Sequence, residues 1–188
     1  EVEKIRGISH FLEHMFFKGA DRYKNTKEVS EAIDSVGGEF NAFTGKEYAG
    51  YFVKSGAQNL EKSLDVLSDM LLHAQLNQAE INRERGVILE EMAMYLDMPT
   101  YQISWDFEQL VFGDQPLGRD QIGTRTLIEN VTSEQFKQYR NELYVPGNMV
   151  ITIAGAVNEK SLEMVEKYFD MPEAKQGREL ESFDTNIA

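Results

Sequence analysis

Cysteine is absent from this sequence of 188 residues. Disulfide bonds, a thiolate nucleophile and a thiolate metal ligand are therefore excluded, and any metal ion must be held by histidine and carboxylate side chains. Basic residues are scarce, with 19 Lys and Arg against 32 Asp and Glu and a formal net charge of −13. Such a chain repels phosphate groups, which argues against nucleic acid or an anionic membrane surface as a partner and favours a basic or extended cationic peptide.

Long apolar runs are absent too. No run reaches the roughly 18 residues of a membrane-spanning helix, so we expect no membrane span. The length suits one domain with a sizeable core, and we expect residues 1–188 to form a single domain. Residues 1–6 have the composition of neither a signal nor a transit peptide. Because they lead directly into a candidate metal motif, we expect the chain to be cut from a longer one.

Histidine is rare, and two of the three histidines lie in one predicted helical turn. A helix advances about 100° per residue, so His10, Glu13 and His14 share one face. Two imidazoles four residues apart can bind one divalent ion, and a carboxylate beside them can act on a metal-bound water. The order His-x-x-Glu-His is the inverted-zincin pattern. Ordinary, non-ligating histidines remain the alternative, and a third ligand would decide between them.

A predicted helix over residues 78–97 offers that ligand. Glu84 and Glu91 fall within its apolar arc, whereas Glu90 falls outside it. An ionised carboxylate facing a core needs a cationic or metal partner. Arg85 is one candidate partner, and a metal held by His10 and His14 is the other.

The rest of the chain predicts mixed secondary structure. Short β-branched and aromatic runs at 39–44 and 48–54 predict a β-hairpin, whose first strand is by periodicity alone a plain core strand. A further strand is predicted at 149–154. Helices are predicted at 25–36, 58–75, 102–112, 132–144 and 158–169, with a loose tail beyond Pro172. His73, near the end of one helix, and the single Trp are interpreted as structural. We expect an α+β fold, a mainly antiparallel sheet with helices on one face.

Five blocks in order give the chain a family resemblance. They are residues 7–19 (GISHFLEHMFFKG), 37–44 (GGEFNAFT), 84–92 (ERGVILEEM), 116–124 (PLGRDQIGT) and 144–150 (YVPGNMV). The chain resembles the pitrilysin or insulinase-type zinc peptidases, and most closely the branch that holds the mitochondrial processing peptidase β-type subunit and its bacterial relatives. The resemblance implies the metallohydrolase fold of that branch.

The resemblance also implies roles for individual residues. His10, His14 and Glu91 would bind Zn²⁺, with Glu13 as the general base. Glu84 would complete the catalytic set by orienting a ligating histidine. Asn41, Ala42 and Phe43 would form the strand on which an extended peptide substrate is added, which reverses the preference for a plain core strand.

The predicted activity is that of a zinc metalloendopeptidase. The resemblance implies that members of this branch contain a pair of similar domains. We therefore expect that this chain lacks the first strands of its own domain. We also expect a second homologous domain or subunit as its partner, as in a dimer. A catalytically silent subunit that serves as a scaffold is the alternative. A metal-dependent lyase of the S-ribosylhomocysteine type is disfavoured because its third ligand is Cys.

His and carboxylate ligands also suit other divalent ions. A cytoplasmic, bacterial-type location is expected.

Overall fold

The computed structural model describes residue 1 and residues 3–173. Eight α-helices and two strands follow one another in these residues: α1 (Ile8–Phe16), α2 (Thr26–Asp34), β1 (Glu39–Thr44), β2 (Ala49–Lys54), α3 (Leu60–Leu72), α4 (Gln78–Asp97), α5 (Pro99–Phe112), α6 (Arg125–Asn130), α7 (Ser133–Leu143) and α8 (Glu159–Tyr168). The predicted tail lies outside the described residues from position 174 onward. Within the described part of the chain, no helix combines the length and apolar composition needed to cross a membrane.

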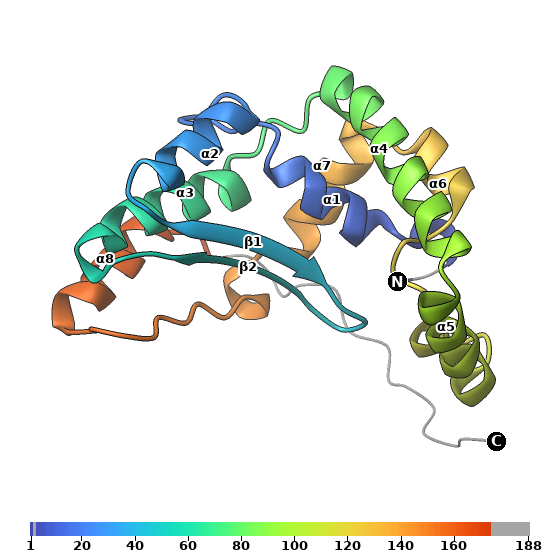
Figure 1. Ribbon diagram of the computed structural model, residues 1–188. Helices are drawn as coiled ribbons and strands as arrows, with labels where there is room; N and C mark the ends of the chain where they lie inside the picture. Colours follow the sequence, from blue (N-terminus) through green and yellow to red (C-terminus); the bar gives the residue numbers. More distant parts are fainter. Residues whose placement is uncertain (2, 174–188) are drawn as a thin grey trace.

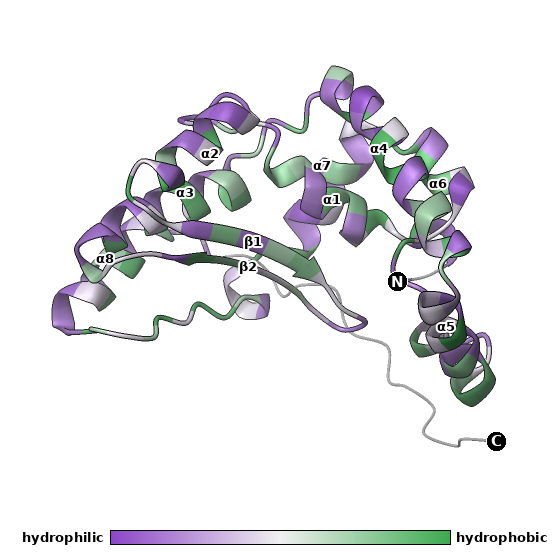
Figure 2. Cartoon of the chain, in the orientation of Figure 1, coloured by the Kyte–Doolittle hydropathy of each residue, from purple (hydrophilic) through white to green (hydrophobic). Residues whose placement is uncertain are grey.

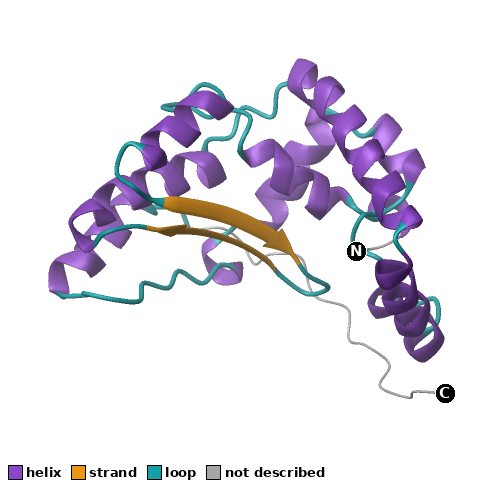
Figure 3. Cartoon of the chain, in the orientation of Figure 1, coloured by secondary structure: helices purple, strands orange, loops and turns teal. Residues whose placement is uncertain are grey.

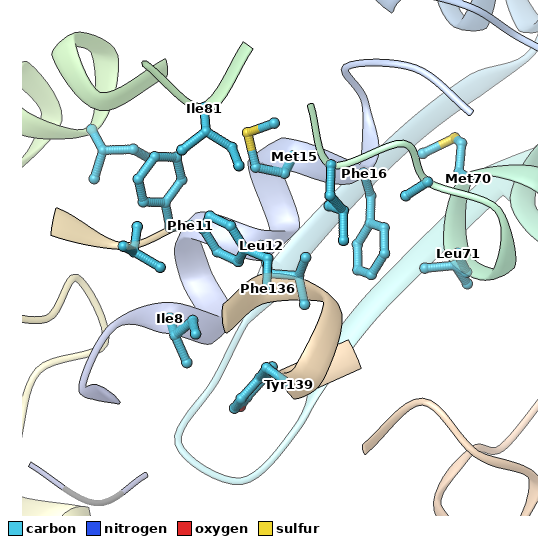
Figure 4. Packing of buried hydrophobic residues seen from close by; sticks show 14 of the residues in the cluster. Ile8, Phe11, Leu12, Met15, Phe16, Met70, Leu71, Ile81, Phe136 and Tyr139 are labelled. Atoms are coloured by element: carbon cyan, nitrogen blue, oxygen red, sulfur yellow. The ribbon is translucent and has the colours of Figure 1, made fainter. Parts of the chain in front are cut away.

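Helix α1 is the centre of the hydrophobic core. Its five apolar side chains are almost completely buried: Ile8, Phe11, Leu12, Met15 and Phe16. They pack against residues from α3, α4 and α7 (Figure 4). The rings of Phe11 and Phe136 meet edge to face, with their centroids 5.1 Å apart. Burial of each large apolar side chain stabilises the fold by about 1.5–3 kcal/mol. The helix that carries both candidate histidine ligands is therefore rigidly held by its opposite side.

The β-hairpin lies beside this central helix. Strands β1 and β2 pair antiparallel with Asn41 opposite Phe52 and Ala42 opposite Tyr51, and α1, α2 and α3 contact the hairpin (Figure 1). Helices α4, α5 and α6 gather at the other end of the molecule, near the tip of the hairpin. The arrangement brings β1 and α4 to α1 from different parts of the chain.

The α+β prediction was confirmed in part: the two strands pair antiparallel with helices beside them, but the extensive sheet that we expected is not found in the described part of the chain. In the described residues the sheet has two strands, and helices dominate the fold (Figure 3). Residues 149–154, predicted to be a strand, run outside any sheet, and Val150 is 92% exposed. A β-branched sequence favours a strand only when a neighbouring strand supplies hydrogen bonds and side-chain packing, and the described residues provide none here.

Most predicted helices were confirmed, with shifted ends. Helix α5 begins at Pro99, whose fixed φ suits the first turn, and not at residue 102. Helix α6 was missed because it is short. Its N-cap Thr124 accepts a hydrogen bond from the Leu127 amide, and it buries Leu127 and Ile128.

Two glycines fix the start of α1 against a distant loop. Gly7 and Gly123 have φ values of +93° and +88°, which L side chains rarely adopt. A Cβ atom on Gly123 would lie 2.4 Å from both the Arg6 carbonyl oxygen and the Gly7 Cα. The Asp120 carboxylate pairs with Arg6 and accepts a hydrogen bond from the Gly123 amide at 2.9 Å. The loop before α6 is thereby locked to the helix that bears the histidines.

Candidate metal centre

Three side chains from α1 and α4 converge at one point. His10 and His14 project from the polar face of α1, and Glu91 faces them from α4. The His10 Nε2 lies 3.7 Å from Glu91 Oε1, and the His14 Nε2 lies 3.5 Å from Glu91 Oε2. One potential ligand atom from each residue lies within 4.8 Å of the other two. The structure thus brings together the three residues predicted to bind the metal.

These separations suit a single small cation. Two ligand atoms bound at 2.0–2.1 Å to a tetrahedral zinc ion lie about 3.4 Å apart. The distances from the two Glu91 oxygens to the Nε2 atoms of His10 and His14 are close to this value. Burial lowers the pKa of His10, which favours the neutral imidazole that a metal requires. Two histidines and one carboxylate are also a donor set that zinc uses in peptidases. The residues present therefore fit the ion.

Glu84 contacts one of the two histidines. Its Oε1 lies 3.0 Å from Nδ1 of His14, and the residue is 6% exposed. Burial acts to raise the pKa of Glu84, but hydrogen bonds from His14 and Lys18 outweigh it and lower the pKa overall. An ionised carboxylate only accepts hydrogen bonds, so His14 donates from Nδ1 and keeps the Nε2 lone pair free. This matches the contact predicted for Glu84.

Arg85 does not serve as the partner of either carboxylate. Its guanidinium donates to the carbonyl oxygens of Ile128 and Val131, at the end of α6. The alternative in which Arg85 neutralises Glu84 or Glu91 is therefore wrong, and Arg85 instead attaches α4 to α6.

Glu13 lies on the same side of α1 as the two histidines, and its carboxylate contacts the last residue of strand β1. The Thr44 hydroxyl, at the last position of β1, donates a hydrogen bond to Glu13 Oε2. Burial raises the pKa of Glu13, although the hydrogen bond from Thr44 acts in the opposite direction. A carboxyl group with a raised pKa is better suited than an ordinary one to accept and return a proton near neutral pH.

The predicted substrate strand leads directly to this carboxylate. Asn41, Ala42 and Phe43 precede Thr44 on β1, whose neighbour among the described residues is β2 alone. The Asn41 side chain accepts a hydrogen bond from the Ala42 amide at 2.9 Å. Phe43 is half exposed and meets Tyr48 edge to face. One edge of β1 therefore has no strand partner in the described part of the chain.

Three further residues support the site and were missed from the sequence. Thr44 binds Glu13, Lys18 binds Glu84, and Tyr95 lies near enough to Glu91 to feel its charge. Burial and the Glu91 charge raise the pKa of Tyr95 to about 12, so this hydroxyl remains a donor. Lys18 and Tyr95 each follow a predicted ligand by four residues, so helical spacing was a usable signal. His73, by contrast, lies outside the metal cluster, as expected.

Two sequence profiles of known families match the chain. Residues 1–125 match the family described as insulinase (peptidase family M16). Residues 130–188 match the family described as the peptidase M16 inactive domain. The first match contains every predicted site residue.

Curated relatives have names that agree with this match. A Bacillus subtilis protein named "Uncharacterized zinc protease YmxG" is 38% identical over 175 residues, which are 93% of this chain and 42% of the relative. An Arabidopsis thaliana protein named "Probable mitochondrial-processing peptidase subunit beta" is 37% identical over 171 residues, which are 90% of this chain and 32% of the relative. The chain thus spans less than half the length of these relatives.

Solved structures share the fold. A protease from Helicobacter pylori matches with a TM-score of 0.87 and 26% identity, covering 100% of this chain and 45% of that one. The first half of the periplasmic protease PqqL from Escherichia coli matches with a TM-score of 0.85 and 25% identity, covering 99% of this chain and 41% of that one.

Proposed function

We propose that this chain, which belongs to the insulinase family of peptidases (peptidase family M16), carries the metal site of a zinc metalloendopeptidase that hydrolyses extended peptides. The observation that carries the proposal is the convergence of His10, His14 and Glu91 at zinc-binding separations, next to the carboxylate of Glu13. In this proposal the three converging residues hold the ion, and Glu13 is the general base.

The chemistry of the proposal divides between the metal and the protein. A bound zinc ion supplies Lewis acidity, which lowers the pKa of a coordinated water to about 7. Glu13 accepts a proton from the water that attacks the scissile carbonyl and then donates it to the leaving amine. The Thr44 hydroxyl holds one oxygen of Glu13 and so fixes the direction of the other. Glu84 orients His14 through its Nδ1 hydrogen.

The substrate binds in this proposal as an additional strand. An extended peptide pairs with the free edge of β1 at Asn41, Ala42 and Phe43, and its backbone then lies in register with the strand that ends at Thr44. The side chain of Asn41 must release the Ala42 amide for this pairing. Backbone hydrogen bonds select an extended conformation with little regard to sequence, which suits an endopeptidase.

A second homologous domain or subunit is proposed to complete the substrate cleft. Helix α5 presents Ile103, Phe107 and Leu110 at helical spacing, and all three side chains are exposed, Leu110 to 80%. Figure 2 shows hydrophobic positions (green) along this helix. Exposed apolar stripes of this kind often mark an interface. The greater length of the relatives is consistent with such a partner.

A scaffold role is the competing function. The match of residues 130–188 to the inactive-domain profile favours it. The complete set of ligands and the nearby Glu13 favour catalysis, because a purely structural subunit has no need of a metal site.

Zinc content is the first test. The 188-residue chain, purified without chelators and passed through gel filtration, is expected to contain about one zinc ion per molecule by elemental analysis. His10→Asn should lose the ion. His73→Asn, which alters the third histidine outside the cluster, should retain it. Zinc-free wild-type protein, or equal loss in both variants, would contradict the proposed site.

Cleavage is the second test. Internally quenched extended peptides are incubated with the zinc-loaded chain, alone and together with the proposed second homologous domain or subunit. Cleavage that is lost in Glu13→Gln supports the peptidase. A zinc-loaded protein that cleaves no peptide in either form would favour the scaffold.

A further inference from the structure

Lys18 is joined to the metal site through a buried carboxylate. It lies four residues after His14 and eight after His10, just beyond the end of α1, and its side chain is 24% exposed. The ammonium group lies 2.6 Å from Oε2 of Glu84, while Oε1 of the same carboxylate lies 3.0 Å from Nδ1 of His14. Lys18, Glu84 and His14 therefore form a continuous chain of charge-assisted contacts.

The two oxygens of Glu84 have separate partners. Because Lys18 binds Oε2, the plane of the carboxylate is fixed with Oε1 directed at the imidazole. A carboxylate anchored at both oxygens cannot rotate, and its acceptor oxygen determines which nitrogen of His14 bears the hydrogen. Among the described residues, Lys18 is the one hydrogen-bonding or ion-pairing partner of Oε2. Loss of the ammonium would free the carboxylate to turn away from His14.

His10 lacks comparable support. Its Nδ1 is buried and has no hydrogen-bond partner among the described residues. Of the two imidazoles, His14 is therefore the one whose orientation is fixed by a hydrogen bond from its Nδ1, and the acceptor of that bond is Glu84. This asymmetry makes Lys18 more important to the site than its distance from the three ligands suggests.

We propose that Lys18 is a positioning residue of the metal site, which fixes the Glu84 carboxylate so that His14 keeps its Nδ1 hydrogen and presents Nε2 to the metal. The inference rests on the proposed zinc site. Its competing explanation is structural: a lysine at the C-terminus of a helix interacts favourably with the helix dipole and stabilises α1 without any effect on the metal.

Zinc affinity distinguishes these explanations without an activity assay. Competition with a chelator of known strength is measured for the wild-type chain, Lys18→Met, Lys18→Arg and the control Lys27→Met, which removes an exposed charge from α2. Residues that orient a ligating histidine typically contribute 10- to 100-fold to metal affinity, so Lys18→Met should weaken zinc binding about tenfold or more. Lys18→Arg should restore most of the affinity because it also donates to a carboxylate. Lys27→Met should bind zinc like the wild type.

A double-mutant cycle tests whether Lys18 acts through Glu84. In a Glu84→Gln background, Lys18→Met should cause little further loss of zinc affinity, since the carboxylate it positions is gone. Imidazole ¹⁵N NMR of the metal-free chain gives an independent measurement: His14 should be the Nδ1-H tautomer in the wild type and a mixture in Lys18→Met. Urea unfolding of each metal-free variant separates loss of folding from loss of zinc.

The outcomes separate this inference from the proposed function. A wild-type chain that binds zinc, with Lys18→Met binding equally well, would overturn the role of Lys18 and leave the metal site intact. Equal losses from Lys18→Met in the wild-type and Glu84→Gln backgrounds would also overturn it, because the effect would bypass Glu84. A wild-type chain that binds no zinc would overturn both.

Discussion

Replacement of Glu91 by Gln tests the metal site most directly. The substitution keeps the shape of the side chain but removes its charge and one of the two oxygens that face the imidazoles of His10 and His14. Glu90, the neighbouring carboxylate on the same helix, is exposed and provides a matched control. A local change of charge or helix propensity would affect both variants alike.

The expected magnitude follows from the position of Glu91. Residues that only orient a ligand contribute 10- to 100-fold to metal affinity, so the loss of one of three direct ligands should exceed about 100-fold, or about 2.7 kcal/mol. At a free zinc concentration of about 100 times the wild-type Kd, zinc stabilises the wild type by about 2.7 kcal/mol and the variant by about 0.4 kcal/mol. For a chain of this size, the difference of about 2.3 kcal/mol corresponds to roughly 5–9 °C in Tm.

Two assays measure this effect. Chelator competition gives the zinc affinity, and thermal unfolding with and without zinc gives the increase in Tm that zinc causes. We expect Glu91→Gln to lose nearly all of this zinc-dependent increase in Tm and Glu90→Gln to keep it. Equal zinc affinity in the two variants would refute the reasoning, and loss in Glu90→Gln alone would identify Glu90 as the ligand.

Three other perturbations probe the base, the fold and the pH dependence. Glu13→Gln should retain zinc but lower peptide cleavage by about 10²- to 10⁴-fold, and substantial residual turnover would remove Glu13 from the role of base. Gly123→Ala should lower the free energy of unfolding in urea by about 2–5 kcal/mol, because the left-handed backbone is strained by a side chain and the new Cβ would overpack against Arg6 and Gly7. The control Gly147→Ala, which has open space around its Cβ, should change that free energy by under about 0.5 kcal/mol. Burial lowers the pKa of His10 below 6.5, so the unfolded chain binds this proton more readily. The metal-free wild type should therefore lose stability relative to His10→Gln as the pH falls below 6.5, and parallel pH profiles in urea unfolding would contradict this.

Much of the site was predictable because it depends on local geometry. The four-residue spacing of His10 and His14 places them on one face of any helix. Glu84 and Glu91 were identified because ionised groups in an apolar arc need partners. Local signals also predicted the hairpin and the helix over residues 78–97, whose bounds agree with α4.

Other features depended on tertiary partners that no local pattern reveals. The strand expected at 149–154 has the right residues, but a strand exists only beside another strand. Arg85 had a carboxylate within helical reach, yet it binds carbonyl oxygens at the end of α6. The sequence left the partner of Arg85 open because several acceptors compete for one guanidinium, and only the packing of α4 on α6 selects among them.

The sequence by itself determined which groups are available for metal chemistry: no thiolate, two histidines on one helical face and a glutamate between them. Tertiary structure decided how these groups are oriented. Glu91 reaches the imidazoles because α4 packs against α1, Thr44 reaches Glu13 because β1 ends there, and Lys18 anchors Glu84. The physical reason is the separation along the chain of the residues that interact. Helical periodicity fixes which residues are neighbours within a few positions of each other. Contacts between distant elements arise only when burial of the α1 side chains assembles the core.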